Sequence, residues 1–265
     1  MAGSIRIGVL ISGTGSNLGA ILDACRAGRI DGRVVFIGSD NPEAPGLRYG
    51  PRYDIPVLTV DYREIISRVR RDPQGAAGPP DFDLDEVLAK QSLLDGDTPP
   101  ERRRIFLVSR ALAEAELLAA MKPHSFDLLV LAGFMRTLTP YFIDRVNVSP
   151  AEPRIMNIHP ALLPAFPGVD GYGDTYRYGC KVAGCTVHFV DYGEDSGPII
   201  AQRCFPVTEN DTLESVRKKG LEQEWALFPE CIQLFARGRL KTVVRRFDTG
   251  DGKTIQRTVV RIISE

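Results

Sequence analysis

The chain has 265 residues, of which 43% are hydrophobic and 25% charged, the composition of a globular domain large enough to bury a core. Its formal net charge of −1 gives no general field for polyanions, so we expect no nucleic-acid partner. No apolar run reaches the roughly 18 residues that span a bilayer, and the N-terminus lacks a signal-peptide layout, so we expect no membrane partner.

The first half of the chain alternates β-branched runs with helix-length segments. Apolar residues at i, i+3 and i+4 predict a helix over 16–28, and β-branched runs predict strands over 5–12, 34–40, 55–61 and 126–133. The last of these strands is apolar throughout, as expected when helices cover both faces of a sheet. The pattern predicts an α/β fold with a doubly wound, mainly parallel sheet.

Residues 72–100 interrupt this alternation with five prolines and seven acidic residues against one lysine. We interpret them as a solvated, partly mobile insertion on the surface, in which "LDEVLAKQSLL" forms a short helix.

The second half predicts strands over 182–190 and 197–207, followed by a helix over 212–238 that is interrupted near Pro229. Two alternating strands around "DTGDGK" then predict a C-terminal β-hairpin. We therefore expect a catalytic domain over 1–240 and a hairpin extension over 241–265.

The cysteines indicate a reducing compartment. There are five, an odd number, and no two of them have C-x-x-C spacing, so free thiols and a cytoplasmic location are expected. The three histidines are far apart in sequence, and no metal site is predicted.

Three stretches carry residues suited to chemistry. "ISGTGSN" (11–17) links the first strand to the first helix and favours binding of a single phosphate, whereas Leu18 stands where a dinucleotide fingerprint needs its third glycine. In "NIHP", alternation along an extended segment directs Asn157 and His159 to the same side. Asp195, in the loop "DYGEDSGP", is placed to meet a histidine from a neighbouring strand end and to favour its cationic form.

Together these stretches resemble the phosphoribosylglycinamide formyltransferases, a family of folate-dependent formyltransferases. The matching segments are "VLISGTGSNLGAILDA" (9–24), "LVLAGFMRTLTPYF" (129–142), "MNIHPALLPAFPG" (156–168), "TVHFVDYGEDSGPII" (186–200) and "FARGRLK" (235–241). The resemblance implies transfer of the formyl group of 10-formyltetrahydrofolate, the co-substrate, to the amine of glycinamide ribonucleotide in purine biosynthesis. It also implies a monomer or homodimer that acts on small molecules without a metal.

The resemblance assigns roles to residues of this chain. Asn157, His159 and Asp195 match the family's catalytic trio. The residues that match the family's phosphate-binding turn for the ribonucleotide are Gly15, Ser16 and Asn17. Glu224 matches a glutamate that binds the same substrate. Residues that match the folate pocket are Met135, Arg136, Thr137, Leu138 and Val190, with Arg103 aligned to a folate-contacting arginine.

The chain departs from the family pattern after "FPG". Asp170 and Tyr172 stand where two histidines are usual, and Trp225 stands where a histidine often follows the glutamate. A formyltransferase with a changed amine substrate therefore remains an alternative. So does a 10-formyltetrahydrofolate hydrolase, a family that carries an additional N-terminal domain, and so does a catalytically silent folate- or nucleotide-binding protein.

Overall fold

The computed structural model describes residues 4–147, 149 and 151–264. Its main sheet has seven strands in the order β3-β2-β1-β4-β5-β6-β7. The strands are β1 (Ile5–Ile11), β2 (Gly32–Ser39), β3 (Val57–Thr59), β4 (Leu128–Leu131), β5 (Ile155–His159), β6 (Val182–Phe189) and β7 (Ile199–Pro206). β1 to β5 pair in parallel, and β6 and β7 are antiparallel to their neighbours. The predicted α/β fold with a mainly parallel sheet is confirmed.

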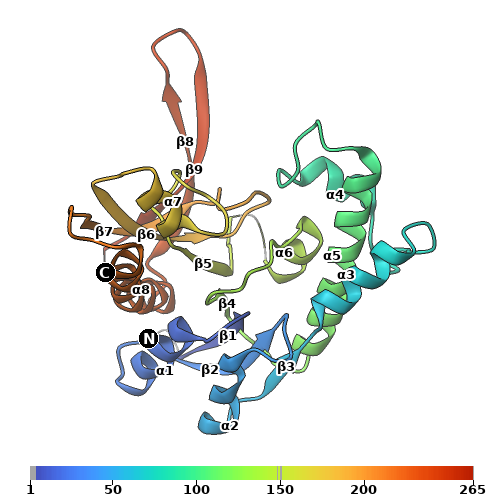
Figure 1. Cartoon of the computed structure of the whole chain (residues 1–265), viewed down its shortest axis with the longest axis horizontal. Helices are drawn as coiled ribbons and strands as arrows, with labels where there is room; N and C mark the ends of the chain where they lie inside the picture. The colour runs from blue at the N-terminus through green and yellow to red at the C-terminus, as the bar shows by residue number, and fades with distance from the viewer. Residues whose placement is uncertain (1–3, 148, 150, 265) are drawn as a thin grey trace.

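Helices cover both faces of this sheet (Figure 1). They are α1 (Ser16–Arg26), α2 (Tyr49–Tyr53), α3 (Tyr62–Arg71), α4 (Leu84–Lys90), α5 (Pro100–Met121), α6 (Pro140–Val146), α7 (Gly171–Arg177) and α8 (Leu213–Ala236), with a 3₁₀ turn, η1 (Pro45–Arg48). One core cluster joins the strands to α1 and α8, and a second joins them to α3, α5 and α6. Along β4, Leu128 and Val130 belong to the first cluster and Leu129 and Leu131 to the second, so both faces are buried as the apolar run predicts.

The acidic insertion is more tightly attached to the domain than a solvated loop. α4 packs Val87 against Leu107 of α5 in an apolar cluster of its own. Lys90 bridges to Asp144 of α6 at 2.8 Å, and the amide of Ser92 donates to the carbonyl of Tyr192 at 2.9 Å. Residues 82–92 contain the expected short helix and are mostly exposed, but the apolar side of that helix packs against α5, a partner that local composition does not reveal.

α8 continues through Pro229 over its full 24 residues. Proline cannot donate the usual helical hydrogen bond, and this is why the sequence predicted an interruption. The flanking residues Leu227, Phe228, Cys231 and Ile232 are buried in the first core cluster. Their burial stabilises the continuous helix despite the missing bond.

The C-terminal hairpin consists of β8 (Leu240–Asp248) and β9 (Thr254–Ile262), which form a separate two-stranded sheet. Figure 1 shows it projecting from the main sheet. Leu240 and Val260 at its base pack against the first core cluster, whereas Phe247 and Ile255 near its tip are exposed. Among the described residues, the hairpin thus packs against the domain at its base.

Candidate active site

A cavity of about 480 Å³ lies at the carboxyl ends of β1, β4 and β5. The strand order reverses between β1 and β4, and ligands of open α/β sheets bind at this kind of switch point. The cavity brings together most of the residues singled out in the sequence: Ser16, Asn17, Met135, Arg136, Thr137, Leu138, Asn157, His159, Val190, Asp195 and Glu224.

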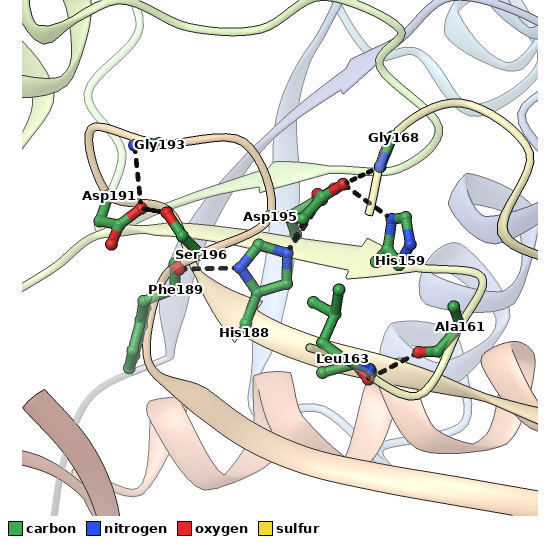
Figure 2. A network of polar contacts seen from close by, with 12 residues as sticks. His159, Ala161, Leu163, Gly168, His188, Phe189, Asp191, Gly193, Asp195 and Ser196 are labelled. Carbon is green, nitrogen blue, oxygen red and sulfur yellow. Dashed lines mark hydrogen bonds and ion pairs between the residues drawn. The ribbon is translucent and has the colours of Figure 1, made fainter. Parts of the chain in front are cut away.

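His159, at the end of β5, is held between two acceptors. Its Nδ1 lies 3.1 Å from Asp195 Oδ2, and its Nε2 lies 2.8 Å from the carbonyl oxygen of Phe166 (Figure 2 shows the Asp195 contact). Burial opposes the charge on this imidazole, but the hydrogen bond and charge of Asp195 outweigh it and raise the His159 pKa. Because a carboxylate and a carbonyl can only accept, both ring nitrogens donate and the geometry favours the imidazolium.

Asp195 is anchored on both of its oxygens. Oδ2 also accepts the amide of Gly168 at 2.9 Å, and Oδ1 faces the imidazole of His188 at 3.6 Å. Burial alone would raise the Asp195 pKa, but the hydrogen bond and charge of His159 and the hydrogen bond from the Gly168 amide lower it strongly. Asp195 itself has a φ of 50°, a left-handed conformation that aspartate tolerates better than most residues. The carboxylate is therefore ionised and fixed beside His159.

Asn157 points to the same side of β5 as His159, as alternation predicts. Its Nδ2 lies 3.2 Å from His188 Nε2 and 3.5 Å from Asp195 Oδ1. His188 sits opposite Asn157 in the β5–β6 pairing and donates from Nδ1 to the carbonyl of Phe189. The sequence did not assign His188 to this group; its only signal was a place near a strand end. The contact to Asp195 is long, so the Asn157 amide keeps a donor for a ligand oxygen.

The proline-containing segment after His159 is held by Thr186 of β6. The Thr186 hydroxyl donates to the carbonyl of Ala161 at 2.7 Å and accepts the amide of Leu163 at 3.0 Å. The prolines restrict this segment, and Thr186 anchors it to the sheet. Together they place the Phe166 carbonyl against His159.

The phosphate-type turn precedes α1. Gly15 has a φ of 73°, which favours glycine, and α1 begins at Ser16 with no acidic residue in its first turn. The free amides of a helix N-terminus suit an anion. Asn17 donates from Nδ2 to Oε2 of Glu224 at 2.7 Å, which links this turn to α8.

The loop after β4 forms the opposite wall. The amide of Met135 donates to Ser12 Oγ at 2.7 Å, and Arg136 Nε donates to Asp40 Oδ2 at 2.5 Å. Arg110 of α5 interacts electrostatically with Arg136, and its Nε and Nη1 have no hydrogen-bond partner among the described residues. Arg110 is not among the residues that line the cavity.

Arg103 is not brought to this cavity. It lines a separate hollow with Pro73, Gln74, Leu84 and Leu88 at the insertion. A larger cavity, of about 1080 Å³, lies at the amino ends of β1, β4 and β5, where Arg6 pairs with Asp127 at 2.8 Å. It contains none of Asn157, His159 and Asp195.

Within residues 4–147, 149 and 151–264, no three or more His, Cys, Asp or Glu side chains are grouped so as to hold a metal ion. In the same part of the chain, no helix is long and apolar enough to cross a membrane. All five cysteines are free thiols.

The cavity combines the fixed imidazolium of His159, the adjacent amide donor of Asn157 and the N-terminus of α1. These are the elements of an acyl-transfer site for a phosphorylated substrate. Residues 5–232 match the family model described as formyl transferase. The chain therefore belongs to the formyl transferase family.

The similar proteins differ in how much of their own length matches this chain. A phosphoribosylglycinamide formyltransferase of Mycobacterium tuberculosis is 34% identical over 250 residues, which cover 94% of each chain. The trifunctional purine biosynthetic protein adenosine-3 of Chironomus tentans is 30% identical, but the matched region spans only 14% of that protein's length. Among solved structures, glycinamide ribonucleotide transformylase 1 from Symbiobacterium toebii is 37% identical with a TM-score of 0.68, and the match covers 98% of this chain and 94% of that one.

Proposed function

We propose that the protein transfers the formyl group of 10-formyltetrahydrofolate to the amine of glycinamide ribonucleotide, in the cytoplasm and as a step of purine biosynthesis. The observation that carries this proposal is the pair of donors at the end of β5. Asn157 and a cationic His159 face one cavity, and the Asp195 carboxylate lies 3.1 Å behind the imidazole. The names of the similar proteins support the choice of substrates.

In the proposed reaction, the amine nitrogen attacks the formyl carbon and the carbonyl electrons move to oxygen. Asn157 Nδ2–H and His159 Nε2–H stabilise this oxyanion; a donor of this kind contributes roughly 3–4 kcal/mol. His159 Nε2–H leaves the Phe166 carbonyl to do so. A proton passes from the new ammonium to the folate nitrogen, the bond between carbon and that nitrogen breaks, and formylated ribonucleotide and tetrahydrofolate result.

The two substrates occupy different walls of the cavity. Ser16, Asn17 and Glu224 hold the ribonucleotide, with its phosphate at the N-terminus of α1. The loop from Met135 to Leu138 and Val190 hold the folate. Arg110 does not line the cavity, but its positive charge, which also acts on Arg136, would attract the negative tail of a folate.

The test is folate release from 10-formyltetrahydrofolate with and without glycinamide ribonucleotide, for the wild type and His159→Ala. Release that needs the ribonucleotide and is lost in the variant is the expected result. Release at an equal rate without the ribonucleotide would replace the proposal by a hydrolase. Binding of folate without any release would identify a silent binding protein.

A further inference from the structure

Tyr172 of α7 fits closely against α8. The side chain is 5% exposed and packs in a small apolar cluster with Ala183, Phe205 and Val216. A Cβ atom at Gly220 would lie 2.1 Å from Tyr172 Cζ, and the next nearest atoms are also at the far end of this ring. The absence of a side chain at position 220 is therefore what lets the tyrosine reach past α8.

The hydroxyl of Tyr172 reaches Glu224. It donates to Glu224 Oε1 at 2.8 Å, and Asn17 donates to Oε2 at 2.7 Å. Each carboxylate oxygen thus has one donor from a different helix and keeps lone pairs for a ligand in the cavity. The bond joins the changed stretch after "FPG" to the ribonucleotide side of the site.

The ionised form of Glu224 depends on these donors. Burial raises the Glu224 pKa, and the hydrogen bonds from Asn17 and Tyr172 and the charge of His159 oppose that rise. The Cys185 thiol also faces this group, and because burial raises its pKa to about 12 it stays neutral. Four groups act on Glu224, namely Asn17, Tyr172, Cys185 and His159, and of these four only His159 carries a positive charge.

α7 is fixed to α8 by charge as well. Asp170, immediately before α7, pairs with Arg177 of that helix and with Arg217 of α8, both at 2.8 Å. These groups are partly exposed, so the pairs orient α7 more than they stabilise the fold. The two positions where the family usually has histidines thus serve one purpose here, which is to dock α7 beside Glu224.

We infer that Tyr172 is a positioning residue, which holds the Glu224 carboxylate ionised and directed at the ribonucleotide, and that Gly220 is its required neighbour. This inference rests on the proposed function for the identity of the ligand.

Tyr172→Phe tests this with little change of shape. Loss of the donor should raise the Glu224 pKa, move the acidic limb of kcat/KM for the ribonucleotide to higher pH, and raise KM on the order of tenfold with kcat little changed. Tyr172→His should restore much of the loss, because imidazole is again a donor. Thermal unfolding of each variant separates these effects from loss of fold.

Gly220→Ala tests the fit between the two helices. It should reproduce the effects of Tyr172→Phe, because the new methyl group displaces the ring. In the Tyr172→His background it should do much less, since histidine lacks the ring atoms nearest to position 220.

The titration of Glu224 is followed directly by carbon-13 NMR of labelled glutamate, assigned with Glu224→Gln. A raised pKa together with a raised KM in Tyr172→Phe supports the inference. An unchanged titration and an unchanged KM in a folded Tyr172→Phe overturn it. A raised pKa in a protein whose wild type does not formylate the ribonucleotide supports the positioning of Glu224 and refutes the proposed function instead.

Discussion

Replacing Asp195 by asparagine removes the negative charge behind His159 and keeps the size of the side chain. The amide oxygen can still accept from His159 Nδ1 and from Gly168, while the new amide nitrogen faces His188 Nε2, which can accept. Backbone and side-chain positions should therefore survive. What is lost is the charge-assisted part of the bond that favours the imidazolium.

The expected loss of kcat/KM can be estimated from the burial of the His159–Asp195 pair. The side chains of His159 and Asp195 are 3% and 13% exposed, so solvent screens them little. A buried hydrogen bond to a charged group contributes about 2–3 kcal/mol, which corresponds to a fall in kcat/KM of roughly 30- to 160-fold. The assay is formyl transfer at saturating folate with varied ribonucleotide.

The pH dependence of kcat/KM tests the role of Asp195 independently of the size of the rate loss. Asp195 is what raises the His159 pKa against burial, so the alkaline limb of kcat/KM should move to lower pH in Asp195→Asn. An alkaline limb at the wild-type pH, with kcat/KM unchanged in a folded variant, would refute the reasoning that the imidazolium is the active form.

The His159–Asp195 pair also contributes to the free energy of unfolding within a limited pH range. The folded pKa of His159 is raised, so its contribution is complete below the unfolded value of about 6.5 and is lost as pH rises through the folded value. The folded pKa of Asp195 is lowered, so its contribution is present above about 3.9 and is lost as pH falls through the folded value. Urea unfolding should therefore show the largest destabilisation by Asp195→Asn between these two limits, and an equal loss at pH 9 would contradict the ion pair.

Three further outcomes are expected. Arg110→Met should raise KM for the folate on the order of tenfold and leave KM for the ribonucleotide unchanged, whereas Arg102→Met, an exposed change on the same helix, should alter neither. Ser92→Pro removes the amide that holds the Tyr192 carbonyl and should lower kcat/KM by roughly fivefold, for about 1 kcal/mol, while Ser92→Ala keeps the amide and the rate. A chain ended after residue 239 should keep its kcat/KM, because the hairpin lines no part of the cavity, and should lose about 2 kcal/mol of stability, or roughly 4–8 °C in Tm. Loss of transfer activity would show that residues 240–265 belong to the catalytic unit.

The sequence predicted the fold and the centre of the site because both depend on short-range patterns. Apolar runs separated by helical spacing define a parallel sheet, and the carboxyl ends of its strands meet at one edge. Asn157 and His159 share a face by alternation alone. The sequence also predicted that Asp195 would meet a histidine from a neighbouring strand end, and the pairing of β5 with β6 brings the two together.

What the sequence did not predict are contacts between segments that are distant along the chain. The bond from Tyr172 to Glu224 spans 52 residues and depends on the missing side chain at Gly220. The insertion meets the catalytic loop through Ser92 and Tyr192, which neither local stretch reveals. Such contacts arise from tertiary packing, which composition and periodicity do not encode.

The most direct test of the proposed reaction follows the formyl group itself. 10-Formyltetrahydrofolate labelled with carbon-13 in the formyl group is incubated with the protein and glycinamide ribonucleotide, and the products are separated and analysed by mass spectrometry. We predict that the label appears on the ribonucleotide, one formyl group per tetrahydrofolate released, and that Asn157→Ala and His159→Ala abolish it. Label recovered as formate, with the ribonucleotide unchanged, would contradict the account.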